Sequence, residues 1–225
     1  MVSHSGELLK EAAREIKPKL RGWLHLATFP LSLVAGIVLI ALAPDNTARL
    51  ASTVFAGSST SLFGVSALFH RGHWGPRWHG VLRRLDHSNI FLLIAGTYTP
   101  FAIMLLDGTS AKLLLSLVWG GALLGIAFRV FWIGAPRWLY LPVYIALGWA
   151  AVFWLGDFAR SAGPAVLTLI IAGGLLYSVG GLVYGFKWPN PIPRWFGFHE
   201  VFHTCTIAAF SAHYVGISII VYGAR

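Results

Sequence analysis

Two histidines near the end of the chain give the sequence its clearest chemical signal. In the string His199-Glu200-Val201-Phe202-His203 they occupy positions i and i+4. On a helix, side chains at this spacing lie on one face about 6 Å apart, which suits two ligands of one tetrahedral zinc ion. The string also matches the H-E-x-x-H pattern of zinc peptidases, in which the glutamate is a general base. The spacing leaves open whether Glu200 faces the metal or the lipid headgroups.

A third ligand and a carboxylate are expected at the same depth. One apolar stretch ends at His70, the next begins just after Asp86, and the last begins at the histidine pair. If each stretch crosses a membrane, all four groups lie in the same leaflet. We therefore predict that His70, His199 and His203 bind Zn²⁺ in an open site of the catalytic type, where the pKa of a bound water falls to near neutrality. The alternative is a group of interfacial histidines whose rings reach the headgroups.

Ser66 and Asp86 are expected beside this metal. Ser66 precedes His70 by one helical turn, so its hydroxyl could orient the imidazole or bind a substrate carbonyl; a small residue for close helix packing is the alternative. Asp86 could orient or deprotonate the water, or be a fourth ligand. Its alternative is an ion pair with Arg83 or Arg84. The candidate catalytic residues are Asp86, Ser66 and Glu200.

The other histidines carry weaker signals. We interpret His25, His73, His79 and His87 as interfacial residues, because they lie near the ends of apolar stretches. His213 lies about 15 Å deeper than the histidine pair, so it cannot share a mononuclear site. We interpret it as a hydrogen-bonded packing residue, with the lining of a deeper cavity as the alternative.

The elements that position these groups must cross a membrane. Of the 225 residues, 56% are hydrophobic and 11% are charged, against roughly 25% charged in a soluble domain. Stretches of about 20 apolar residues, each long enough to cross a hydrocarbon layer of roughly 30 Å, follow one another along the chain. We predict an all-α, polytopic membrane protein with a bundle of seven transmembrane helices. The predicted spans are 23–43, 49–70, 88–106, 112–132, 138–156, 163–185 and 199–222.

The positive charges predict an orientation. Thirteen Lys and Arg residues fall on the side of the N-terminus and four on the other side, which places the N-terminus in the cytoplasm and the C-terminus outside. We divide the chain into a cytoplasmic amphipathic segment at 1–22 and a membrane domain at 23–225, located in the cell membrane. A cleaved signal peptide is not expected. The cations behind the net charge of +9 lie in the short segments between apolar stretches, so we expect membrane lipids as partners and no nucleic acid. The sequence identifies no particular protein partner.

Taken in order, these motifs resemble the haemolysin III branch of the progestin and adipoQ receptor family. The resemblance is carried by Ser66-x-x-x-His70, Leu85-Asp86, His199-x-x-x-His203, Arg21-Gly22-Trp23-Leu24-His25 and Gly96-Thr97-Tyr98-Thr99-Pro100. It implies a seven-helix bundle with a cytoplasmic N-terminus and zinc held by the three histidines, with Asp86 and Ser66 in the same site.

The resemblance also implies an activity. It points to a zinc hydrolase acting on lipid amides, as in the ceramidase activity attributed to the adiponectin receptors, and to a role in membrane lipid homeostasis. Those receptors typically have a glutamine where this chain has Glu200, which leaves the identity of the base open. They also have a long cytoplasmic N-terminal region, so hormone reception is not expected here.

Three functions therefore remain open. The first is a zinc-dependent hydrolase of lipid amides. The second is an intramembrane zinc protease, with Asp86 as the third ligand and Glu200 as the base. The third is a non-enzymatic sensor or scaffold, in which zinc holds the second, third and seventh spans together. A pore is the least supported function, because no span carries a periodic polar stripe.

Overall fold

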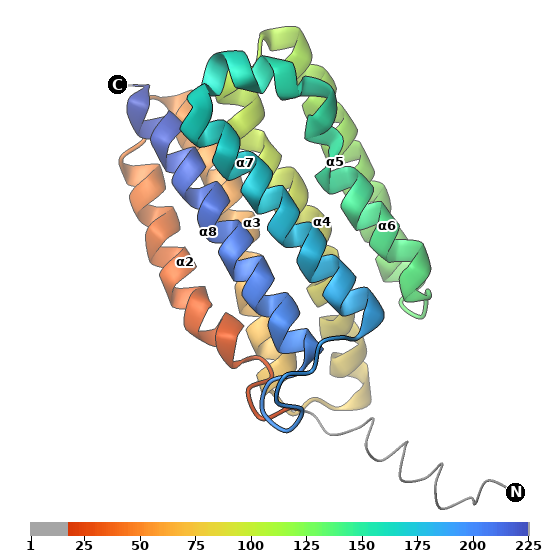
Figure 1. Ribbon diagram of the computed structural model, residues 1–225. Helices are drawn as coiled ribbons and strands as arrows, with labels where there is room; N and C mark the ends of the chain where they lie inside the picture. Colours follow the sequence, from red (N-terminus) through yellow and green to blue (C-terminus); the bar gives the residue numbers. More distant parts are fainter. Residues whose placement is uncertain (1–17, 225) are drawn as a thin grey trace, which may run out of the picture.

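The computed structural model describes residues 18–224, and this part of the chain is built of helices (Figure 1). Most of the predicted segment 1–22 lies outside the described residues. In order, the elements are α2 (Trp23–Ala41), α3 (Asn46–Arg71), α4 (Pro76–Leu105), α5 (Gly108–Phe131), α6 (Arg137–Gly148), the 3₁₀ helix η1 (Ala150–Trp154), α7 (Leu155–Phe186) and α8 (Phe198–Gly223).

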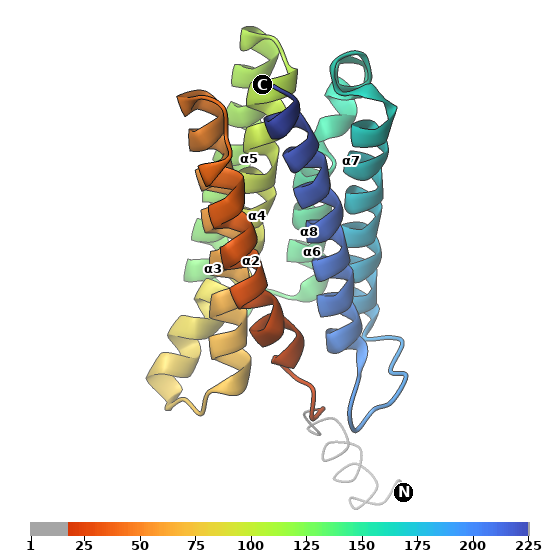
Figure 2. The same cartoon turned by 90° about the vertical axis from the view of Figure 1, so that its left-hand side faces the viewer.

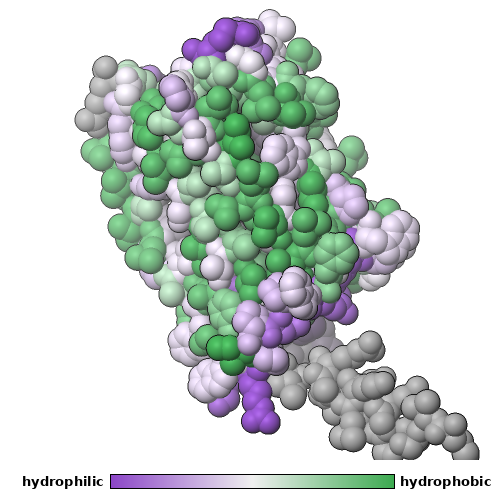
Figure 3. Space-filling view, viewed as in Figure 1, coloured by the Kyte–Doolittle hydropathy of each residue, from purple (hydrophilic) through white to green (hydrophobic). Residues whose placement is uncertain are grey.

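Six helical stretches among the described residues are long and apolar enough to cross a membrane. Four of the six are α2 to α5, the fifth is the 50-residue stretch Arg137–Phe186, and the sixth is α8. Large apolar side chains such as Leu124, Phe131 and Phe153 are more than 70% exposed. Figure 3 shows apolar residues over the side of the bundle and hydrophilic residues at its two ends. The chain is therefore a multi-pass protein of the cell membrane.

The stretch Arg137–Phe186 contains a reversal rather than one straight helix. It comprises α6, η1 and α7, and within α7 the backbone of Gly163 leaves the helical region at φ 71° and ψ 165°. Figure 1 shows α6 and the later part of α7 side by side, joined by a turn at the upper end of the bundle. The break that Gly163-Pro164 predicts is thus a sharp bend, since glycine allows the positive φ and proline cannot continue the helix hydrogen bonds.

The bundle is organised around α3 and α4, which have the largest buried share among the spanning stretches. Helix α3 packs between α2 and α4, helix α5 lies on α4, and α7 packs on α8. Helix α8 also contacts α2 and α4 and so closes the bundle (Figure 2). The core holds large rings such as Phe55, Phe63 and Phe91, each at most 1% exposed.

One end of the bundle brings together the starts of α2, α4, α6 and α8 and the ends of α3, α5 and α7 (Figure 1). We call it the basic end, because the predicted excess of Lys and Arg belongs to its connections. Here the sequence prediction needs a correction. Helix α4 begins at Pro76 and not near residue 88, so most of the expected loop is helical. Proline is favourable in a first helical turn, where its missing N–H has no partner to lose.

At the opposite end, Asp107 marks the predicted break between two spans and caps α5. Its carboxylate accepts hydrogen bonds from the backbone N–H groups of Thr109, at 2.9 Å, and Ser110, at 3.0 Å. These donors, chiefly the one from Ser110, lower the pKa of Asp107. The cap fixes where α5 begins, because it satisfies N–H groups that have no partner within the helix.

Two glycines of α5 allow the packing of this helix on α4 to be tested. A Cβ at Gly125 would lie 2.3 Å from the ring of Phe91, whereas nothing lies within 4 Å of a Cβ at Gly120. We expect Gly125→Ala to lower the thermal midpoint of the detergent-purified protein, because the buried ring cannot move without disturbing the core. Gly120→Ala should leave the midpoint unchanged or raise it, because alanine favours a helix over glycine by about 0.5–1 kcal/mol. Equal midpoints for the two variants would contradict this α4–α5 packing.

Candidate metal centre and its cavity

Three histidines from the ends of two helices meet at the basic end. The nitrogens that His70, His199 and His203 offer as ligands all lie within 4.8 Å of one another. His70 stands in the last turn of α3, and the other two stand in the first two turns of α8. Nε2 of His70 and Nε2 of His199 are 3.2 Å apart, although 129 residues separate them in the sequence. The predicted meeting of these imidazoles is present, and the group could hold a metal ion.

The segment before α2 seals one side of this histidine group. Gly22 has a φ of 83°, and a Cβ there would lie 2.7 Å from the Cβ of His70. Any larger residue would combine a strained backbone with a steric clash. The chain therefore passes close to the last turn of α3 because this position is glycine.

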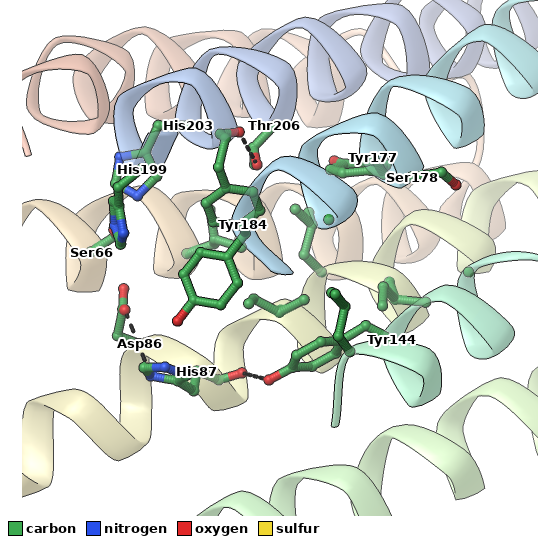
Figure 4. A pocket seen from close by; sticks show the side chains of 18 of the residues that line it. Ser66, Asp86, His87, Tyr144, Tyr177, Ser178, Tyr184, His199, His203 and Thr206 are labelled. Carbon is green, nitrogen blue, oxygen red and sulfur yellow. Dashed lines mark hydrogen bonds and ion pairs between the residues drawn. The ribbon is translucent and has the colours of Figure 1, made fainter. Parts of the chain in front are cut away.

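Asp86 and Ser66 also lie at the histidine group (Figure 4). Oδ2 of Asp86 is 3.8 Å from Nε2 of His70, and its side chain is 16% exposed. The side chain of Ser66 lies near the Asp86 carboxylate. The alternative ion pairs of Asp86 with Arg83 or Arg84 are absent from the described residues. Instead, Arg84 donates hydrogen bonds to backbone carbonyl groups.

Glu200 has neither of the two orientations that the sequence leaves open. Its side chain is buried and accepts hydrogen bonds from Nε of Arg21 and from the backbone N–H of Gly197, the latter at 2.8 Å. It is not among the residues that line the neighbouring cavity. Glu200 therefore caps α8 and joins it to the segment before α2. The partner Arg21 could not be predicted, because sequence patterns do not distinguish it from the other cations of that segment.

His25 is not interfacial, contrary to the sequence prediction. It is 2% exposed, and its ring stacks on that of His203 with centroids 3.7 Å apart and planes 10° apart. Neither of its ring nitrogens has a hydrogen-bond partner among the described residues. His25 thus supports a face of one candidate ligand. The signal for it was its place in the first turn of an apolar span, four residues after Arg21.

The remaining histidines divide between cavity and surface. The prediction for His87 is wrong, because this residue lines the cavity and its Nδ1 donates to the carbonyl of Arg83 at 2.7 Å. His79 is exposed at the mouth of the cavity, and His73 is exposed outside it. His213 is a hydrogen-bonded packing residue, as predicted, with Nε2 3.2 Å from the carbonyl oxygen of Ile170. It also lines the deep end of the cavity, so both interpretations of His213 hold.

A cavity of about 1070 Å³ begins at the histidine group and runs into the bundle. This volume lies at the upper end of the roughly 300–1,000 Å³ that small-molecule sites occupy. Tyr184, on α7, lines this cavity, and its ring projects into the space that Figure 4 shows. That ring lies 5.8 Å from the His199 ring, and the guanidinium of Arg137 covers it at 4.4 Å. The metal candidate thus opens onto a space large enough for part of a lipid.

The fold and the site together define a helical, multi-pass membrane protein with a histidine group at one end of an internal cavity. Comparison with known proteins agrees with this class. The family described as haemolysin-III related matches residues 13–214. The chain belongs to the haemolysin III family.

Two curated relatives show how far the similarity extends. Hemolysin-3 of Bacillus cereus is 36% identical over 157 residues, which are 68% of this chain and 71% of that protein. The Hemolysin-3 homolog of Bacillus subtilis (strain 168) is 38% identical over 135 residues, which are 60% of this chain and 63% of that protein. The match to the second relative thus covers less than two thirds of its length.

The contacts of Glu200 predict that it stabilises the fold and does not take part in chemistry. Glu200→Gln should lower the free energy of unfolding by about 1–3 kcal/mol, because it removes the charge that pairs with a largely buried guanidinium. The content of bound metal per folded chain should stay the same. Asp157→Asn is the matched control, since its pair with Arg160 is solvent-exposed and should contribute little. A stable Glu200→Gln protein that had lost its metal would contradict this role.

Proposed function

We propose that this protein is a zinc-dependent hydrolase of lipid amides in the membrane. The single observation that carries the proposal is the meeting of His70, His199 and His203 beside the carboxylate of Asp86, at the end of a cavity of lipid size. Three imidazoles and one free position are the donor set of catalytic zinc sites, whereas closed structural sites use four protein ligands.

The residues fit such an ion. In a tetrahedral site with bonds of about 2.0–2.1 Å, neighbouring ligand nitrogens lie roughly 3.3 Å apart. The distance of 3.2 Å between Nε2 of His70 and Nε2 of His199 is close to that value. In addition, Nδ1 of His203 is buried without a hydrogen-bond partner among the described residues. Burying a polar atom without a partner costs free energy, and a bound metal ion would give this nitrogen a partner.

We propose that the chain crosses the membrane seven times, with the basic end in the cytoplasm. A straight helix of 50 residues would be about 75 Å long, against a hydrocarbon layer of roughly 30 Å. The bend at Gly163 supports two crossings within Arg137–Phe186. The excess of positive charge at the basic end supports the orientation.

The residues around the site can carry out amide hydrolysis. Zinc, when bound, supplies Lewis acidity and lowers the pKa of water. In this proposal Asp86 accepts a proton from the attacking water and returns it to the nitrogen of the leaving amine as the C–N bond breaks. Ser66, whose side chain lies near this carboxylate, can help to orient it. The hydroxyl of Tyr184 projects into the same space and can donate a hydrogen bond to the carbonyl oxygen.

The contacts favour this reaction over an intramembrane zinc protease. A protease of the H-E-x-x-H type would need Glu200 as its base, but Glu200 is engaged by Arg21 and Gly197. It would also leave His70 without a role, although this histidine has a nitrogen 3.2 Å from His199.

Metal analysis tests the centre directly. Purified protein should contain about one zinc per chain, and His199→Ala should lose it, because two imidazoles bind zinc far more weakly than three. His73→Ala is the matched control, since His73 is exposed and lies outside the cavity. Full zinc retention in His199→Ala would reject the site.

Turnover tests the role of Asp86. With N-acyl amides reconstituted in lipid vesicles, Asp86→Asn should retain zinc and thermal stability while hydrolysis falls by about 10²–10⁴-fold, the usual contribution of a general base. Asp157→Asn, at the opposite end, should hydrolyse like the unmodified chain.

The same measurements distinguish the hydrolase from a sensor or scaffold. A scaffold would bind zinc and lose thermal stability when the metal is removed, yet would hydrolyse no lipid amide. That combination would overturn the enzymatic proposal and leave a zinc ion that holds α3 and α8 together.

A further inference from the structure

The charged side chains that line the cavity are almost all cations. Among the described residues, its ionisable lining other than histidine and tyrosine consists of five cations, namely Arg21, Arg83, Arg137, Lys187 and Arg194, and one carboxylate, Asp86. A bound divalent metal would increase this positive excess. Clefts with one sign of charge and low-dielectric walls concentrate ligands of the opposite sign.

Two of these cations are already engaged. Arg21 pairs with Glu200. Arg137 donates to the carbonyl of Tyr184 at 2.9 Å and covers the ring of the same residue. Their charges therefore contribute to the potential of the mouth, but their hydrogen bonds are largely used within the protein.

The side chains of Arg83, Lys187 and Arg194 have no hydrogen bond or ion pair within residues 18–224. They come from α4, from the residue that ends α7, and from the connection to α8. All three line the mouth and are exposed. These cations are thus available to a ligand that approaches the histidine group.

The asymmetry of positive charge across the membrane does not explain this arrangement fully. Three other cations of the basic end lie outside the cavity and contact other groups of the protein. Lys19 lies over the ring of Trp195 at 4.3 Å, Arg71 lies over Trp23 at 4.3 Å, and Arg84 binds backbone carbonyl groups. Topology requires cations at this end, but it does not require unpaired ones around the cavity.

We propose that the mouth selects lipid amides whose headgroup is an anion, a carboxylate or a phosphate a few bonds from the amide. The inference rests on the proposed amide hydrolysis for the place of the amide, at Asp86 and the histidine group. The anion would lie against Arg83, Lys187 and Arg194, and the acyl chain would extend along the apolar walls. A neutral lipid amide would gain nothing from these charges.

Binding to purified protein in neutral detergent tests the proposal without requiring turnover. The probes are N-dodecanoylglycine, which is anionic, and N-dodecanoylethanolamine, which is neutral and has the same chain. We expect the anionic amide to bind roughly tenfold or more tightly at low ionic strength, and added salt should reduce the difference.

A pair of charge-matched double variants locates the effect. Arg83→Gln with Lys187→Gln should bring the two affinities close to each other. Lys112→Gln with Arg160→Gln removes two exposed cations at the opposite end and should preserve the preference. Thermal midpoints near that of the unmodified chain would show that the variants fold. Equal binding of both amides by the unmodified chain, or the same loss in both double variants, would overturn the proposal.

Two further outcomes separate this inference from others. Inorganic phosphate that bound as tightly as the anionic amide would indicate a site for soluble anions and would overturn the assignment to a lipid. Equal hydrolysis of both amides would overturn the charge preference while the proposed hydrolase stood. Tighter binding of the anionic amide without hydrolysis of either amide would support the selection of anions by the mouth of the cavity and reject the proposed hydrolase.

Discussion

The cost of placing ionisable groups within a bilayer constrains every polar residue of this bundle. Glu200 is fully buried, and it is tolerated because Arg21 and a backbone N–H satisfy its carboxylate. Arg129, 1% exposed, is covered instead by the ring of Tyr140 at 4.2 Å. Buried charges without such partners are strongly unfavourable in hydrocarbon. Within the group of three histidines, Nδ1 of His203 has no hydrogen-bond partner among the described residues, and the three rings could hold a metal ion.

The meeting of the histidines could be predicted because the sequence shows both their depth and the shared face of two of them. Apolar stretches show where a chain enters and leaves the membrane, so His70, Asp86 and the pair on α8 could be assigned to one leaflet from the sequence. His199 and His203 are four residues apart, so they lie on the same face of a helix. All-helical architecture and most of the breaks between helices follow from the same pattern, together with turn residues such as Asp107 and the Gly163-Pro164 pair.

What the sequence could not reveal depends on rotation about the helix axes and on the paths of the connections. Hydropathy does not show that His25 faces His203, or that Glu200 turns toward Arg21, because both facts require the packing of α2 against α8. The early start of α4 was hidden for a different reason. Its first turns are rich in Arg, Trp and His, and they resemble a surface loop in composition although Pro76 begins a helix there.

The link between the segment before α2 and the start of α8 joins residues 179 positions apart in the sequence. During synthesis, Arg21 leaves the ribosome long before Glu200 exists, and His70 likewise precedes the pair on α8. Helix α8 is translated after the other described helices. The contacts Arg21–Glu200 and His70–His199 can therefore form only once α8 has joined the bundle, however early their first partners are made.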